Sequence, residues 1–331
     1  MIKPLISVII VTYNNEDVIA QCLNTLKIQS LKDYELIIVD NSSHDATINI
    51  IESLNMERVK LVSLQVNLGF TGGNIEGLKV AKGKYIALLN PDTEPSPSWL
   101  ETLLKSIKEQ KDIGLCASKL LVFGSELIDS AGDGCTVTGK GHKRGEGKNK
   151  RYFDQKEMVF GACGGAMLIK KELIDEIGFF DNDFFLIHED TDFCFRAQLA
   201  GWKCLYVPEA VVNHKVRTSI GKMSDLAVYY SLRNARFVVI KNMPFSLILR
   251  YHHYYVIQEV LSFLFFVVKH KKFRPYFQAG FDFLKWVPAL LDKRRQIQKL
   301  KKVKTREIHS LLTPIWDKDF LIQKFNKVFR Q

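Results

Sequence analysis

The sequence predicts an α/β fold, in which a mostly parallel, Rossmann-like sheet is flanked by helices. Short apolar runs rich in Val and Ile recur before residue 92, and each has the length of a buried strand. The segments between these runs carry apolar residues at helical spacing. Such an alternation is typical of parallel strands joined by right-handed crossovers. With 331 residues, 47% of them hydrophobic, the chain can bury one large core and carry an extension.

Four strands and three helices are predicted in this part of the chain. The predicted strands are residues 5–11, 35–39, 59–65 and 86–89. The predicted helices are residues 16–29, residues 46–54 and a third segment that ends near residue 81. A polar or glycine-rich break precedes each helix, namely Thr12-Tyr13-Asn14-Asn15, residues 41–45 and residues 67–74. Polar clusters of this kind are typical of helix starts.

Two acidic residues lie where predicted strands end. Asp40 ends the second strand, and Asp92 follows the fourth in the sequence Asn90-Pro91-Asp92. Ligands bind at the carboxyl edge of open α/β sheets. Asp40 could therefore accept a hydrogen bond from a ribose hydroxyl or a base imide, and Asp92 could hold Mg²⁺ or Mn²⁺ on phosphates. The alternatives are a helix cap for Asp40 and a simple turn for Asp92.

The glycine-rich break contains Gly69, Gly72 and Gly73, which let backbone amides approach a diphosphate. Glycine-rich loops before helices are nevertheless common. This one reads GFTGGN rather than GxGxxG, and the first strand is followed by TYNN, which has no glycine. Both differences argue against a domain that binds NAD.

The net charge of +11 is concentrated at the C-terminal end. Residues 241–331 hold 19 Lys and Arg against 6 Asp and Glu, which leaves 28 basic and 30 acidic residues in the first 240. Clustered Lys and Arg can bind the phosphates of nucleic acid. No recognition motif accompanies them, so a nucleic-acid-binding protein is the less favoured alternative.

The six cysteines form no CxxC pair, which predicts reduced thiols in the cytoplasm. The start MIKPLISVII lacks the features of a signal peptide, and no apolar run reaches about 18 residues. The sequence therefore predicts neither a secreted protein nor a membrane-spanning helix.

Three acidic residues, Glu189, Asp190 and Asp192, follow the aromatic pair Phe184 and Phe185. Acidic residues are common in the first turn of a helix, where their negative charge interacts favourably with the helix dipole. Three within four positions exceed what a cap needs, and nearby aromatic rings would raise the pKa of a carboxyl towards that of a general base. Arg196 is expected to pair with one of these acids.

Four motifs resemble the successive landmarks of glycosyltransferase family 2, whose members share the GT-A fold. They are ISVIIVTYNN, LIIVDNSSHD, NLGFTGGN and YIALLNPD. The segment GACGGAMLIKKELIDEIGFFDNDFFLIHEDTDFCFRAQLAGWKCLYVPEAVVNH extends the resemblance, which covers about residues 4–240 and is nearest to the bacterial rhamnosyltransferase-like branch. The chain departs at Ile75, where these enzymes often carry a second Asn.

The resemblance implies a donor that is a nucleoside-diphosphate sugar, linked to dTDP or UDP. The donor-binding residues that it implies are Thr12, Tyr13, Asn14, Asp40, Asn67, Gly72, Gly73, Asn74 and Asn90. Asp92 and His214 would hold Mn²⁺ or Mg²⁺, with Lys215 and Arg217 near the diphosphate. A surface or core histidine is the alternative for His214, and a solvated basic loop is the alternative for Lys215 and Arg217.

The resemblance also implies a catalytic role for Asp190 as the base, with Glu189 orienting the acceptor and Asp192 as the alternative base. Residues 160–168 would line the acceptor entrance, and strand packing is the alternative role for the glycines of this segment. The expected reaction is an inverting transfer of a sugar, L-rhamnose being one candidate, to a glycan or a polyprenyl-diphosphate-linked acceptor in the synthesis of envelope polysaccharide. A catalytically degenerate scaffold is the alternative.

Two domains are expected, a GT-A domain over residues 1–240 and a helical extension over residues 241–331. The extension places aromatic segments beside basic ones, with residues 281–287 as the aromatic face and residues 293–304 as the basic run. Such helices suit an anionic membrane surface, which would place the enzyme on the inner face of the plasma membrane. A helical cap on the enzyme or a homodimer contact is the alternative.

Overall fold

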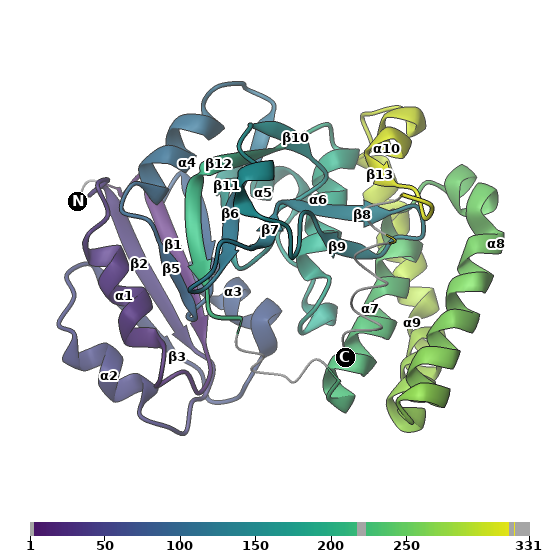
Figure 1. Ribbon diagram of the computed structural model, residues 1–331, viewed down its shortest axis with the longest axis horizontal. Coiled ribbons are helices and arrows are strands. Elements are labelled where there is room, and N and C mark those ends of the chain that lie inside the picture. Colours follow the sequence, from purple (N-terminus) through teal and green to yellow (C-terminus); the bar gives the residue numbers. More distant parts are fainter. Residues whose placement is uncertain (1–2, 217–222, 318–320, 322–331) are drawn as a thin grey trace.

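The computed structural model describes residues 3–216, 223–317 and 321 (Figure 1). Its main sheet has the strand order β10-β12-β6-β11-β4-β1-β2-β3. The four predicted strands form one end of it, as β1 (Ile6–Thr12), β2 (Tyr34–Asp40), β3 (Val59–Ser63) and β4 (Tyr85–Leu89). All their mutual pairings are parallel, as the β-α-β order predicts.

The other half of the sheet is mixed. Strand β11 (Ala166–Lys170) is antiparallel to both β4 and β6 (Ile113–Val122), and β12 (Lys203–His214) runs parallel to β6. The edge strands β5 (Thr93–Pro95), β7 (Ile128–Ala131) and β10 (Glu157–Val159) pair antiparallel. The α/β class is confirmed, while the predicted parallel pairing holds mainly for the first four strands.

Both faces of the sheet are buried, which explains the uninterrupted apolar runs. Ile10 and Leu89 face the helices α1 (Ile19–Lys27) and α4 (Trp99–Ile107), whereas Ile9 and Leu88 face the opposite core. That second core is closed by α3 (Gly69–Val80), α5 (Lys171–Ile177) and α6 (Glu189–Leu199). Helix α2 (Thr47–Ser53) packs beside α1.

A small second sheet lies between the main sheet and the C-terminal helices (Figure 1). It contains β8 (Asp133–Thr136), β9 (Gly141–Lys143) and β13 (Leu312–Thr313). Short 3-10 turns occur at η1 (Lys150–Tyr152) and η2 (Asn182–Phe184).

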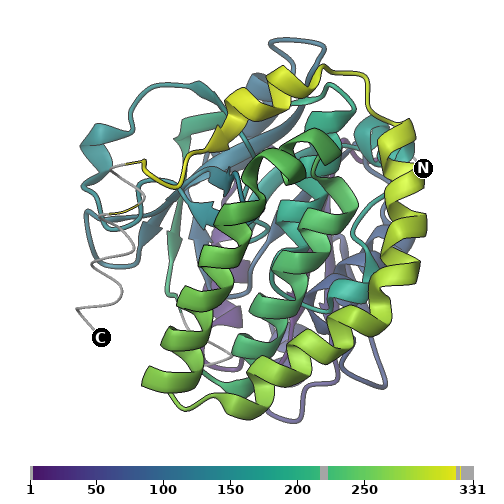
Figure 2. The same cartoon turned by 90° about the vertical axis from the view of Figure 1, so that its right-hand side faces the viewer.

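The C-terminal part is helical, as expected. Its elements are α7 (Asp225–Asn242), α8 (Phe245–Ser262), the π-helical turn η3 (Phe263–Lys269), α9 (Phe273–Lys299) and α10 (Thr305–Leu311). Figure 2 shows α8, α7 and α9 side by side on one face of the molecule. The expected domain boundary at residue 240 falls inside α7 and stays a prediction. Among the described residues, no helix has the length and hydropathy that crossing a membrane requires.

Candidate active site

The loops after β1 and β2 are tied together at the carboxyl edge of the sheet. The backbone N–H of Asn14 donates to Ser43 Oγ (3.0 Å), and Asn14 Oδ1 accepts from the backbone N–H of His44 (2.9 Å). Thr12 Oγ1 donates to Asn15 Oδ1 (3.0 Å). Asn14 has a φ of 52°, a conformation that Asn tolerates better than most residues. These bonds fix the two loops on either side of Asp40.

Asp40 is 1% exposed at the end of β2. Its Oδ2 accepts a hydrogen bond from the backbone N–H of Ser43 (3.1 Å). Its Oδ1 is buried and has no hydrogen-bond partner within the part of the chain that the structure describes. Leaving a buried carboxylate oxygen unpaired is unfavourable, so this atom is suited to a donor from a ligand. The predicted capping role accounts for only one of the two oxygens.

The glycine-rich segment differs from the predicted loop because α3 already begins at Gly69. A Cβ on Gly73 would lie 2.5 Å from Val11, and one on Gly72 would lie 2.5 Å from Leu68. Gly73 therefore lets α3 pack closely against β1, whereas Gly72 leaves room for the side chain of Leu68 one turn earlier. Asn74 is buried and donates to the carbonyl oxygen of Phe70 (2.8 Å). The structure favours a packing role for all three, and their contact with a donor stays a prediction.

Asn67 begins this segment, and its Oδ1 accepts from the backbone N–H of Gly69 (2.8 Å). A second asparagine, Asn41, joins the segment to β2. It donates to the Gly69 carbonyl (2.9 Å) and accepts from the Leu68 N–H (2.9 Å). The start of α3 is thus held beside Asp40.

Asp92 and His214 meet across the pairing of β5 with β12, in which Thr93 is opposite His214. His214 Nε2 lies 3.4 Å from Asp92 Oδ1, and both side chains are largely buried. The backbone N–H of Lys215 donates to the Asp92 carbonyl (2.9 Å). A carboxylate and a neutral imidazole are a donor set that suits Mn²⁺. Burial alone would lower the pKa of His214, but hydrogen bonds to Asp129 and Asp92 raise it to about 9, so a cation at this site would have to displace the imidazole proton.

The other predicted residues near this pair have separate contacts. Asn90 lies beside the Gly164-Gly165 segment, where its backbone N–H donates to the Gly165 carbonyl (2.9 Å). The ammonium group of Lys215 pairs with Glu94 at 3.1 Å. Tyr13, in the loop after β1, has an exposed side chain. Arg217 lies outside the described residues.

Asp129 is a residue that the sequence did not single out, and it holds His214 from the other side. Asp129 Oδ2 is 2.9 Å from His214 Nδ1, and Lys143 Nζ donates to both Asp129 oxygens (2.7 and 2.8 Å). Burial alone would raise the pKa of Asp129, but the hydrogen bond from His214 and the charge of Lys143 lower it to about 2. A carboxylate behind a histidine fixes the ring and its tautomer when the ring binds a metal.

We therefore expect Asp129→Asn to weaken Mn²⁺ binding by roughly 10- to 100-fold, because the amide holds His214 less firmly. Titration calorimetry of Mn²⁺ into the purified protein measures this. The matched control is Asp112→Asn, which removes an exposed salt bridge to Lys203. Unchanged Mn²⁺ affinity in Asp129→Asn would show that the contact with His214 has no bearing on the metal.

The turn that leads into α6 is strained. Phe185, Ile187 and His188 have φ values of 62°, 66° and 71°. Such conformations cost about 1–3 kcal/mol each in non-glycine residues and often occur at functional sites. Asn234 on α7 is fully buried, and its Nδ2 donates to the carbonyls of Leu186 and Ile187 (both 2.8 Å). Helix α7 thus stabilises the turn that presents the predicted base.

Asp190 lies in the first turn of α6 and is partly exposed. Its Oδ2 accepts from the backbone N–H of Gly164 (3.1 Å), inside the predicted acceptor entrance, and its Oδ1 accepts from Thr191 (2.7 Å). Asp133 and Cys163 place ligand atoms within 4.8 Å of it and of each other. Burial raises the pKa of Asp190 despite these hydrogen bonds, and burial together with the charge of Asp190 raises the pKa of Asp133. The carboxyl groups of Asp190 and Asp133 therefore bind a proton more readily than an exposed carboxyl does.

Glu189 is buried next to Asp190. Its Oε2 has no hydrogen-bond partner among the described residues. Burial and the neighbouring charge of Asp190 raise the pKa of Glu189 well above its usual range. A neutral carboxyl group can donate a hydrogen bond, which fits a residue that orients a hydroxyl.

Asp192, the alternative candidate for the base, has an environment different from that of Asp190. It is completely buried and contacts Arg196 Nε (3.0 Å), Lys241 Nζ (2.7 Å) and Asn242 Nδ2 (2.8 Å). Burial opposes ionisation, but the charges of Lys241 and Arg196 lower the pKa of Asp192. The pairing of Arg196 with an acid is confirmed, and these contacts make Asp192 a tie between α6 and α7.

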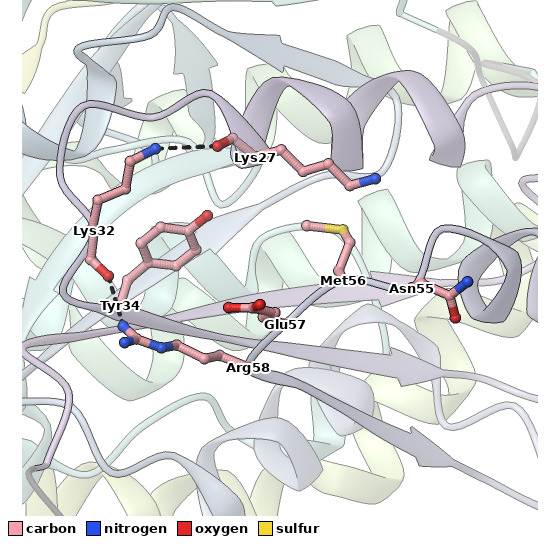
Figure 3. A pocket seen from close by; sticks show the side chains of 7 residues that line it. All are labelled: Lys27, Lys32, Tyr34, Asn55, Met56, Glu57 and Arg58. Carbon is pink, nitrogen blue, oxygen red and sulfur yellow. Dashed lines mark hydrogen bonds between the residues drawn. The ribbon is translucent and has the colours of Figure 1, made fainter.

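A separate surface hollow lies at the amino ends of β2 and β3, the edge opposite Asp40. Figure 3 shows the side chains that line it, which are Lys27, Lys32, Tyr34, Asn55, Met56, Glu57 and Arg58. Its cations bond to backbone carbonyls, since Lys32 donates to Lys27 (3.3 Å) and Arg58 donates to Lys32 (3.0 Å). None of the predicted site residues lines this hollow.

Comparison with known proteins identifies the family. The sequence profile described as "Glycosyl transferase family 2" matches residues 7–178, which is more than half of the chain. An uncharacterized glycosyltransferase of Haemophilus influenzae is 26% identical over 64% of this chain and 66% of its own length. The amylovoran biosynthesis glycosyltransferase AmsB of Erwinia amylovora is 27% identical, over 68% of this chain and 75% of its own length.

A shorter match concerns an enzyme of Campylobacter jejuni described as a GalNAc(5)-diNAcBac-PP-undecaprenol beta-1,3-glucosyltransferase. It is 27% identical over 45% of this chain and 47% of its own length.

Solved structures agree on the fold. GalNAc-T7 with UDP, GalNAc and Mn²⁺ superposes with a TM-score of 0.60 at 18% identity, over 72% of this chain and 48% of that one. The mannosyltransferase PcManGT from Pyrobaculum calidifontis, with GDP-Man and Mn²⁺, gives a TM-score of 0.53 at 13% identity, over 100% of this chain and 89% of that one. The chain belongs to glycosyltransferase family 2 and is a glycosyltransferase with the GT-A fold.

Proposed function

We propose that the protein is an inverting glycosyltransferase that moves a sugar from a nucleoside diphosphate to an acceptor hydroxyl. The main support for this proposal is the environment of Asp190, a partly exposed carboxyl with a raised pKa in the first turn of α6, directly after a strained turn. A group of this kind is suited to accept a proton at neutral pH. Asp92 and His214 supply a cation site at the carboxyl edge of the same sheet.

In this mechanism Asp40 binds the nucleoside through its unpaired Oδ1. A divalent cation held by Asp92 and His214 would supply charge neutralisation for the leaving diphosphate. Asp190 removes the proton from the acceptor hydroxyl as that oxygen attacks the anomeric carbon on the face opposite the diphosphate. Glu189 donates a hydrogen bond that orients the acceptor. A single displacement inverts the anomeric configuration.

The finer identity of the substrates rests on resemblance. The motifs nearest to the rhamnosyltransferase-like branch make L-rhamnose our proposed sugar, and the imide edge shared by uracil and thymine makes UDP or dTDP the proposed carrier. The relatives named for amylovoran synthesis and for an undecaprenol-linked substrate support a glycan or polyprenyl-diphosphate-linked acceptor. We accordingly propose that the enzyme works at the cytoplasmic face of the plasma membrane, in envelope polysaccharide synthesis.

A thermal-shift screen of nucleotide sugars with and without Mn²⁺ tests the proposal. A ligand that binds only the folded protein raises the Tm by mass action. We expect a UDP- or dTDP-linked sugar to raise the Tm only with Mn²⁺, and Asp40→Ala to abolish the shift. Asp33→Ala, which alters an exposed residue at the opposite end of β2, is the matched control and should retain the shift. An equal shift in Asp40→Ala would contradict the assigned nucleoside contact.

A further inference from the structure

The helices α8 and α9 expose an unusual amount of apolar surface. Of the 24 large hydrophobic residues that are exposed in the described parts of the chain, 14 lie between residues 245 and 291. Each of the 14 is at least 38% exposed. They are Phe245, Leu249, Val256, Ile257, Val260, Leu261, Phe263, Leu264, Val268, Phe273, Phe277, Phe281, Leu284 and Leu291. Contiguous apolar surface of this kind marks an interaction site.

The spacing of these residues shows that whole helix faces are exposed. In α9 the exposed residues Phe273, Phe277, Phe281 and Leu284 recur every three or four positions, which places them on one face. The opposite face carries Ala279, Phe283, Trp286 and Leu290, which pack in the cores that α7 shares. Helix α9 therefore has apolar residues on two opposite sides. One side packs against the rest of the protein, and the other is exposed.

Helix α8 follows the same pattern. Leu247 and Tyr251 are buried against the rest of the protein, while Leu249, Val256 and Val260 are exposed. The π-helical turn η3 joins α8 to α9, and Figure 2 shows the two helices diverging from this turn on the face towards the viewer. We call the exposed apolar residues of α8, η3 and α9 the outer face.

The charges beside the outer face are mostly positive. Residues 245–291 hold six basic residues, Arg250, Lys269, Lys271, Lys272, Arg274 and Lys285, against the two acids Glu259 and Asp282. Both acids have partners, because Glu259 pairs with Arg236 at 2.6 Å and Asp282 accepts from Tyr229 at 2.8 Å. The densest basic cluster, residues 269–274, lies at the turn between the two helices.

In the predicted basic run at residues 293–304, by contrast, several side chains bond to other parts of the protein. Lys293 pairs with Asp181 (2.6 Å) and Asp183 (2.5 Å), and Lys302 pairs with Glu176 (2.7 Å). Arg294 donates to the carbonyls of Ile240, in the last turn of α7, and Met243, just after it (both 2.8 Å). Lys293 and Arg294 attach α9 to the enzyme, and Lys302 attaches the segment that follows it, so these three cations of the basic run are bonded within the protein.

We propose that the outer face lies in the headgroup region of an anionic lipid bilayer, with the basic turn at residues 269–274 contacting the headgroups. Apolar helix faces rich in Phe and Leu, flanked by Lys and Arg, bind such surfaces. A symmetric dimer would oppose two copies of the same positively charged face, which disfavours self-association. The proposal rests on the proposed function, since it places the enzyme at a bilayer that could hold a lipid-linked acceptor, but it does not depend on which sugar is transferred.

Flotation with vesicles tests the proposal on the whole protein. We expect binding to vesicles that mix phosphatidylglycerol with phosphatidylcholine, and much weaker binding to phosphatidylcholine alone or at high salt. The triple variant Phe277→Ser, Phe281→Ser, Leu284→Ser should lower binding at least roughly tenfold, and Lys271→Gln with Arg274→Gln should also lower it. The matched control, Arg295→Gln with Lys299→Gln, changes two exposed cations of the distal end of α9 and should bind as the native protein does.

Two results would overturn the proposal. One is native binding to neither kind of vesicle, or equal binding by the native protein and the triple variant. The other is a native dimer in sedimentation velocity that the triple variant dissociates, which would assign the outer face to a second copy. The Tm of each variant confirms folding, and the Mn²⁺-dependent shift with a nucleotide sugar should be unchanged in all of them. Loss of lipid binding with an intact shift therefore separates this proposal from the proposed function.

Discussion

Asp190→Asn is expected to lower turnover roughly 10²-fold or more, the usual scale for the loss of a general base. The amide has a single oxygen, so it can keep the hydrogen bond from the backbone N–H of Thr191 but loses the one from Gly164. The turn should still keep its shape, because Asn234 holds the carbonyls of Leu186 and Ile187. Donor binding should also persist, because Asp40 and the Asp92–His214 pair are untouched. Steady-state transfer kinetics together with the Mn²⁺-dependent thermal shift measure both effects.

Asp192→Asn provides the contrast. It faces Arg196, Lys241 and Asn242 in the interior, so loss of its charge leaves two cations with weaker partners and should lower the Tm. Native turnover in Asp190→Asn would remove Asp190 from the role of base. A selective loss of turnover in Asp192→Asn, with an unchanged Tm, would transfer the role to Asp192.

Asp92→Ala should abolish the Mn²⁺-dependent part of nucleoside-diphosphate binding. The variant removes the carboxylate that would join the cation to the protein, and it leaves His214 as a single ligand. Calorimetric titration of UDP and of dTDP, each with Mn²⁺ and with EDTA, measures the effect. The native protein should bind more tightly with Mn²⁺, and the variant should bind equally in both conditions.

The control for this experiment is Glu94→Gln, which changes a neighbouring acid paired with Lys215 instead of His214. It should retain the metal dependence. If the native protein and Asp92→Ala bound the nucleotide with the same affinity under both conditions, the metal assignment would be wrong.

The first half of the fold follows from local sequence signals. The apolar runs that became β1, β2 and β4 are short and buried on both sides, whereas β3 at the edge of the sheet is only partly buried. Each of the four is followed by polar residues at the same edge of the sheet. That pattern predicts Asp40 and Asp92 without knowledge of contacts. The helix ends were less exact, since α3 begins within the predicted loop at Gly69.

The residues that surround the predicted base and metal pair could not be found in this way. Asp129, Asp133 and Lys143 lie on the short strands β7, β8 and β9, where no periodic pattern distinguishes a site from a loop. Their importance arises from contacts across the fold, such as that of Asp129 with His214, 85 positions away. The one signal in the sequence is acidic residues within the otherwise small and apolar segment 127–135.

Helix α7 shows a second limit of sequence patterns. Arg233, Asn234 and Lys241 look like the polar side of a surface helix, yet all three are buried. Asn234 and Arg233 bond to the carbonyls of the turn before α6, and Lys241 bonds to Asp181 (2.6 Å). The positions of these polar groups on α7 match the carbonyl groups of the irregular turn. Because such a turn has no periodic sequence pattern, the sequence does not predict which residues of α7 contact it.

The anomeric configuration of the product tests the central claim most directly. Once the thermal-shift screen identifies the donor, transfer to an acceptor can be followed by NMR of the anomeric proton. A single displacement, with Asp190 as base, predicts that the sugar in the product has the configuration opposite to that in the donor. Retention of configuration would contradict the account, because it requires a second displacement or attack on the same face as the departing diphosphate.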